Sequence, residues 1–175
     1  MSKNKQRIWD LPVRLLHWLL VASVVAAWYT GSRIGPVHEY CGYTAAAVVA
    51  LRLLWGFIGT RYARFAQFVP GARATLLYLR QVLAGTAPRY LGHNPLGGWM
   101  VLALLACVAL LGGSGWLMNT DLLWGYAWPV RVHVALAWLL LGLIALHLAG
   151  VLFTSWQHRE NLVGAMLTGD KDGQS

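Results

Sequence analysis

The sequence predicts an all-α integral membrane protein, a bundle of four transmembrane helices that forms one domain over residues 1–175. The first indication is composition: 58% of the residues are hydrophobic and 11% are charged, too few charges to solvate a globular surface of this size. The second is a set of four long apolar stretches, each near the roughly 20 residues that a helix needs to cross a bilayer. The third is the uneven distribution of basic residues between the loops.

The four stretches differ in how clearly they predict a membrane helix. They cover about 14–30, 38–58, 97–118 and 131–154. The third has no charged residue, and between 132 and 153 the fourth has only histidines as ionisable groups, so these two are the clearest. The first follows Lys3, Lys5 and Arg7 as a signal peptide would, but its apolar run continues past a typical cleavage site and contains a histidine. We therefore expect it to be retained as a helix.

The basic residues predict the orientation in the membrane. Eleven fall on the side of both termini and the loop between the second and third stretches: Lys3, Lys5, Arg7, Arg14, Arg61, Arg64, Arg73, Arg80, Arg89, Arg159 and Lys171. Only Arg33 and Arg131 fall on the other side. The positive-inside rule then places both termini in the cytoplasm, in a multi-pass protein of the bacterial inner membrane. The net charge of +8 is explained by this orientation, so nucleic acid is excluded as a partner.

The long cytoplasmic loop, residues 59–95, contains a short amphipathic segment. Over residues 72–84, leucines recur at helical spacing, and two arginines lie on another face: Leu76, Leu79 and Leu83, with Arg73 and Arg80. This pattern predicts a short helix lying on the membrane surface among lipid headgroups. A docking site for a cytoplasmic partner is the alternative.

Four of the six histidines lie in or at the edges of the apolar stretches: His17, His38, His133 and His147. A histidine in a bilayer needs a hydrogen-bond partner, water or a metal, because an unsatisfied polar group there costs several kcal/mol. His133 and His147 are fourteen residues apart, so they share a helix face but lie about 21 Å apart along the axis. One ion cannot bind both, whereas two stacked macrocycles can.

The topology provides a second histidine at each depth. His17 begins the first helix and His147 ends the fourth, both toward the cytoplasm, while His38 and His133 begin the second and fourth helices on the periplasmic side. We therefore predict two bis-histidine b-type haems, His17 with His147 and His38 with His133, as axial ligands of the iron. Bis-imidazole ligation leaves no open position on iron, which suits electron transfer.

Two arginines are candidate partners of the haem propionates. Arg52 lies fourteen residues after His38, at the depth of the cytoplasmic haem. Its guanidinium would pair with a propionate there, or would instead extend to the cytoplasmic interface. Arg14, three residues before His17, is a second candidate on weaker grounds.

The histidine segments also carry a family resemblance. The motifs are Leu16-His17-Trp18, His38-Glu39-Tyr40-Cys41-Gly42-Tyr43, Gly92-His93-Asn94-Pro95-Leu96-Gly97-Gly98, Arg-Leu-Leu-Trp-Gly-Phe at 52–57 and His-Arg-Glu-Asn-Leu-Val at 158–163. With these the chain resembles the prokaryotic cytochrome b561 family, and within it the b-type cytochrome subunits of nickel–iron hydrogenases. The resemblance implies a four-helix membrane protein with non-covalent haem b that moves electrons between a quinone pool and a redox partner.

In that light Glu39, beside the outer ligand His38, is a candidate acceptor for a proton released by quinol. The alternative is an ion pair with Arg33 or Arg131. His93 could line a quinone pocket, contact a propionate or form part of a turn, and we do not predict it to be a ligand.

The predicted function is a di-haem b-type cytochrome that carries electrons between the quinone pool and a redox partner in a respiratory chain. Variants of it are a membrane anchor for a hydrogenase, periplasmic dehydrogenase or cytochrome c, and a quinone reductase fed by superoxide. A histidine-relay transporter for protons or metal is the remote alternative, since the stretches lack the intramembrane carboxylates that such proteins use. The sequence leaves open whether the chain forms a homodimer.

Overall fold

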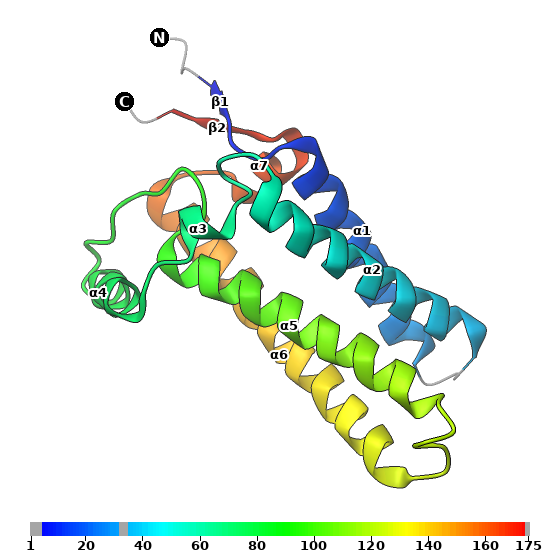
Figure 1. The fold of residues 1–175 in the computed structure, drawn as a ribbon. Helices are drawn as coiled ribbons and strands as arrows, with labels where there is room; N and C mark the ends of the chain where they lie inside the picture. Colours follow the sequence, from blue (N-terminus) through cyan, green and yellow to red (C-terminus); the bar gives the residue numbers. More distant parts are fainter. Residues whose placement is uncertain (1–4, 32–34, 174–175) are drawn as a thin grey trace. The chain divides into compact units, whose positions relative to one another are not determined.

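The apolar stretches form long helices in the computed structural model, which describes residues 5–31 and 35–173 (Figure 1). These helices are α1 (Leu11–Thr30), α2 (Pro36–Ile58), α5 (Pro95–Met118) and α6 (Ala127–His158), and each is long and apolar enough to cross a membrane. The shorter elements are β1 (Lys5–Arg7), α3 (Phe65–Phe68), α4 (Ala72–Leu83), α7 (Leu162–Thr168) and β2 (Asp170–Asp172). The side of the membrane that the termini face stays a prediction, and Lys3 and Arg33 lie outside the described residues.

The chain divides into two compact units, which we describe separately. The bundle unit comprises Leu15–Leu53 and Ala103–Ala145 and therefore holds the larger parts of the four long helices. The terminal unit comprises Met1–Arg14, Leu54–Leu102 and Leu146–Ser175 and holds the remaining helix ends and all the short elements.

Contacts between neighbouring helices give their order in the bundle unit. The ring of His38 on α2 bonds to α1, and a Cβ built on Gly112 of α5 would lie 3.0 Å from that of Ala46 on α2. Cys107 of α5 donates to the backbone of α6 at 3.6 Å, and Trp28 of α1 meets Trp138 of α6 edge to face at 5.3 Å. The cyclic order is therefore α1, α2, α5, α6, which places α2 and α6 diagonally across the bundle.

The helix starts carry local signals that explain where they begin. The Asp10 carboxylate accepts a hydrogen bond from the Val13 N–H at 2.9 Å, and the Asn94 side chain accepts one from Gly97 at 2.7 Å. Both contacts satisfy backbone donors that the first helical turn leaves without partners. Pro36 and Pro95 begin α2 and α5, where a proline costs no hydrogen bond.

The fold is mostly helical, as predicted, and the terminal unit adds a small two-stranded sheet that the sequence did not indicate. β1 pairs antiparallel with β2, with Lys5 opposite Asp172 and Arg7 opposite Asp170. The Arg7 side chain also donates to the Asp170 carboxylate at 3.1 Å. Strands of three polar residues have no alternating apolar pattern, so nothing local in the sequence indicates them. They form because the tertiary fold brings the two ends of the chain together.

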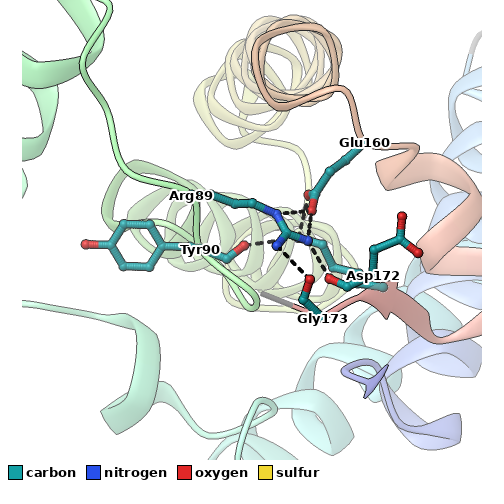
Figure 2. Close-up of polar contacts among 6 residues, drawn as sticks. Arg89, Tyr90, Glu160, Asp172 and Gly173 are labelled. Atoms are coloured by element: carbon teal, nitrogen blue, oxygen red, sulfur yellow. Dashed lines mark hydrogen bonds and ion pairs between the residues drawn. The ribbon is translucent and has the colours of Figure 1, made fainter. Parts of the chain in front are cut away.

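An ion cluster around the buried Lys171 holds β2 in the terminal unit (Figure 2). Arg89 and Lys171 both pair with the Glu160 carboxylate, the lysine at 2.9 Å, and the Lys171 ammonium also donates to the carbonyl of Tyr90 at 3.1 Å. Arg89 donates further to the backbone carbonyl of Asp172 at 2.5 Å. The Lys171 side chain is 4% exposed, and its burial lowers its pKa, against the opposing hydrogen bond and charge of Glu160.

Candidate haem site

His38 and His133 come together in the bundle unit. His38 lies in the first turn of α2 and His133 near the start of α6, and their ring centroids are 6.1 Å apart with the planes at 74°. Two imidazoles on opposite sides of one iron have centroids about 6 Å apart, since each metal bond is about 2 Å and each ring centre lies about 1 Å behind its nitrogen. The observed separation fits one iron between the two rings.

The hydrogen bonds of both rings fix which ring nitrogen carries the proton. The Nδ1 atom of His38 lies 2.9 Å from the carbonyl oxygen of Ala27, which only accepts, so Nδ1 carries the proton. The Nδ1 atom of His133 lies 2.9 Å from the hydroxyl of Ser114, which donates its own proton to the carbonyl of Leu111 at 3.0 Å. Ser114 therefore accepts from His133. In both rings the Nε2 lone pair is available for a metal, the arrangement that metal-binding histidines show.

Glycines lie beside the two rings. A Cβ on Gly115 would lie 3.4 Å from Cε1 of His133, and a Cβ on Gly31 would lie 3.6 Å from Cε1 of His38. At Gly42 and Gly113 a Cβ would meet nothing within 4 Å. Gly31 and Gly115 therefore keep the space beside the two imidazoles clear of side chains, as a flat macrocycle requires.

The donor set suits a macrocycle better than a bare ion. Across residues 5–31 and 35–173, no three histidine, cysteine, aspartate or glutamate side chains gather as a metal site. Two imidazoles supply two of the six positions around an octahedral iron, and a porphyrin supplies the other four. The pair fits haem b, therefore, and not a metal held by side chains alone.

The other two predicted ligands lie in different compact units. His17 belongs to the bundle unit on α1, where its ring meets that of Trp18 edge to face at 5.1 Å. His147 belongs to the terminal unit on α6. Both side chains are half-buried. Their pairing stays a prediction from the sequence spacing.

The two candidate propionate partners differ in their surroundings. Arg52 is 7% exposed in the bundle unit, which argues against a side chain extended to the interface. Arg14, in the terminal unit, donates from one guanidinium nitrogen to the backbone carbonyl of Leu167 near the end of α7. Part of the hydrogen-bonding capacity of Arg14 is therefore already used to hold the end of α7.

Glu39 is exposed in the first turn of α2, next to His38. Of its two suggested partners, Arg33 lies outside the described residues. No ion pair joins Glu39 to Arg131 within the part of the chain that the structure describes. The exposed carboxylate is thus accessible from outside the bundle unit.

The terminal unit contains polar and aromatic contacts around Asp10 and His93, and of these two residues the sequence analysis singled out only His93. Asp10 accepts from the Trp55 indole at 2.9 Å and from the Thr60 hydroxyl at 2.7 Å, in addition to capping α1. The ring of His93 lies 4.7 Å from that of Trp9 and 4.4 Å from that of Phe68. An acidic residue directly before an apolar stretch is an N-cap signal that could have identified Asp10.

The four membrane-length helices indicate a multi-pass membrane protein, and the separation of the His38 and His133 rings is compatible with a haem between them. Residues 8–169 match the model of the family described as prokaryotic cytochrome b561. The chain belongs to the prokaryotic cytochrome b561 family, whose b-type cytochromes carry haem b in electron transfer.

Its relatives include several hydrogenase subunits. A probable Ni/Fe-hydrogenase B-type cytochrome subunit of Rhizobium leguminosarum bv. viciae is 21% identical, over 98% of this chain and 90% of that protein. A probable subunit of the same name from Azotobacter vinelandii is 28% identical and a probable Ni/Fe-hydrogenase 1 B-type cytochrome subunit from Escherichia coli K12 is 27% identical. Each of these two matches covers 51% of this chain and 49% of the relative, about half of its length. No solved structure matches the chain.

Proposed function

We propose that the chain is a di-haem b-type cytochrome that carries electrons across the bacterial inner membrane, between the quinone pool and a redox partner in a respiratory chain. The observation that supports this best is the pair of His38 and His133, with centroids 6.1 Å apart and both Nδ1 atoms hydrogen-bonded. Haem b bound by two imidazoles supplies a one-electron iron centre closed to other ligands. The second site, at His17 and His147, rests on the sequence spacing alone.

The chain's own residues hold and orient the ligands. The Ala27 carbonyl and the Ser114 hydroxyl fix the orientation of the two outer rings and raise the basicity of Nε2. Arg52 is 7% exposed on α2, so its guanidinium lies within the bundle unit and not at the membrane interface. We assign it to a haem propionate, where a charge-assisted hydrogen bond would stabilise both groups.

Glu39 would serve the quinone reaction. Quinol releases protons when it is oxidised, and an exposed carboxylate beside the outer ligand can accept one. A Glu39→Gln variant should slow quinol-dependent reduction of the protein while leaving its haem content unchanged. Equal reduction rates in the variant and the wild type would show that Glu39 has no such role.

For the redox partner we propose a hydrogenase-type dehydrogenase, because the relatives are named hydrogenase cytochrome subunits. Native membranes placed under hydrogen should then show reduction of the cytochrome. If they do not, a periplasmic dehydrogenase, a cytochrome c or superoxide becomes the electron donor or acceptor to test, by stopped-flow reduction of the purified protein.

The first test of the function is a pyridine haemochrome assay with protein quantification, which gives the haem type and the haem per chain. We expect two b haems in the wild type and one in His38→Ala or His133→Ala. His158→Ala, which changes a histidine outside both predicted pairs, is the matched control and should retain two. Two haems remaining in all four ligand variants, His17→Ala and His147→Ala included, would overturn the ligand assignment.

The alternative class, a histidine-relay transporter, predicts a different result. It requires no haem, so protein folded after haem-sufficient expression would be colourless and would move protons or metal ions in liposomes. A visible absorption spectrum of the purified chain separates the two readings before any variant is made.

A further inference from the structure

Helix α4 is held in the terminal unit along one side. Tyr78, 3% exposed, meets the ring of Tyr90 edge to face at 5.4 Å. Thr75 accepts a hydrogen bond from the indole N–H of Trp99, at the start of α5, at 3.1 Å. These contacts anchor the helix through Thr75 and Tyr78 and leave its other side without a protein cover among the described residues.

The uncovered side carries two adjacent stripes. Leu76, Leu79 and Leu83 follow each other at helical spacing and are 51%, 37% and 80% exposed. Arg73 and Arg80, both exposed, lie seven residues apart, about two turns, on the face next to these leucines. An apolar stripe beside a basic stripe is the pattern of a helix that contacts lipid tails and anionic headgroups together.

A hollow opens between this apolar stripe and the first turns of α5. Its volume is about 310 Å³, and it is lined by Ala72, Thr75, Leu76, Leu79 and Trp99. The lining is almost entirely apolar, and the exposed indole of Trp99 has the amphipathic character that favours the membrane interface. The hollow therefore suits a hydrocarbon chain and not a polar ligand.

The charge of the surrounding loop is one-sided. Residues 59–95 contain five arginines and no aspartate or glutamate. Arg89 is paired with Glu160, and Arg64 donates to the backbone of Gly59 at 2.8 Å. Arg73 and Arg80 form no ion pair within residues 5–31 and 35–173, so an external anion can reach both.

We propose that α4 holds an anionic phospholipid, with an acyl chain in the hollow beside Trp99 and the phosphate on Arg73 and Arg80. The apolar hollow accounts for the chain, and the acid-free loop accounts for the preference for a negative headgroup. This proposal requires only that the protein sits in a membrane, so it is independent of the haem assignment.

The test uses the full-length protein as purified in detergent, titrated with phosphatidylglycerol or phosphatidylcholine that carries bromine on its acyl chains. Bromine quenches a nearby indole, and the difference between wild type and Trp99→Phe isolates the signal of Trp99. We expect phosphatidylglycerol to quench Trp99 with at least tenfold higher affinity than phosphatidylcholine. The double variant Arg73→Gln/Arg80→Gln should bind phosphatidylglycerol about 30-fold more weakly than the wild type. It lacks two basic groups, and each contributes about 1 kcal/mol to binding at an anionic lipid surface.

The matched control is Lys5→Gln/Arg61→Gln, which removes the same charge from two exposed residues outside α4. It should change the affinity less than threefold. Leu76→Asn should abolish quenching of Trp99 because it places a polar group in the hollow. The proposal fails if the two lipids bind equally, if the control double variant loses as much affinity as the α4 variant, or if glycerol 3-phosphate competes as well as the intact lipid. Equal lipid binding would instead favour a protein partner on α4.

Discussion

Removing the hydroxyl of Ser114 tests the outer histidine pair without touching either ring. In Ser114→Ala, His133 loses the acceptor that lies 2.9 Å from its Nδ1 atom and fixes its tautomer. The change deletes one oxygen and adds no bulk. If His133 binds iron, its imidazole becomes less well oriented and less basic, and the site should hold haem more weakly.

The expected size follows from the number of hydrogen bonds lost. One hydrogen bond between neutral groups contributes about 0.5–1.5 kcal/mol, and changes to such supporting groups lower metal affinity about 10- to 100-fold. The lost bond joins two uncharged groups, and His133 keeps its place on α6 after the substitution. We therefore expect the low end, about a tenfold increase in Kd for haem, or about 1.4 kcal/mol.

The assay is a titration of apoprotein with haemin, followed in the Soret band. A His147→Ala background removes the second predicted site, so that only the outer one is measured. The matched control is Ser23→Ala, which removes a buried hydroxyl that bonds within its own helix, to the carbonyl of Leu19 at 2.8 Å. Equal Kd values for Ser114→Ala, Ser23→Ala and their parent would refute the assignment of His133.

Three further predictions concern the terminal unit. Glu160→Gln should lower stability by about 3 kcal/mol, because it leaves the Lys171 ammonium buried without its counter-charge; an unchanged Tm in detergent would contradict this. Burial, and to a smaller extent the charge of Tyr90, raises the pKa of the Tyr78 hydroxyl above its ordinary value. As the pH rises, the unfolded chain therefore loses the Tyr78 proton before the folded protein does. The free energy of unfolding should then fall as the pH rises above about 10. Tyr78→Phe should flatten that fall, measured as Tm from about pH 9 to about pH 11, and parallel curves would refute it. Gly169→Ala should destabilise α7 by at least about 1 kcal/mol, because Gly169 has a φ of +91° and an added Cβ would lie 2.6 Å from the backbone oxygen of Trp9. Faster limited proteolysis of the C-terminal segment in the variant would measure this loss.

The long helices could be predicted because their determinants are local. A run of about twenty apolar residues satisfies its backbone only within a helix when it lies in lipid, whatever surrounds it. The amphipathic spacing around Leu76 likewise indicated a helix that the structure forms as α4. The spacing of His133 and His147 is also a local feature, because fourteen residues along one helix fix both the helix face and the axial distance between the two side chains.

The sequence by itself thus determined the mostly helical class and the membrane-length segments, whereas the histidine ligands that it indicates stay a prediction. The tertiary structure alone decided what joins residues far apart in the chain: the pairing of β1 with β2, the contacts of Asp10 with Trp55, and the burial of Lys171 against Glu160. It also decided that α2 and α6 lie diagonally, with two rings 6.1 Å apart and their Nδ1 atoms bonded to α1 and α5. Helix formation depends on neighbours within a few residues, whereas these contacts depend on how whole helices pack, and no local pattern encodes that.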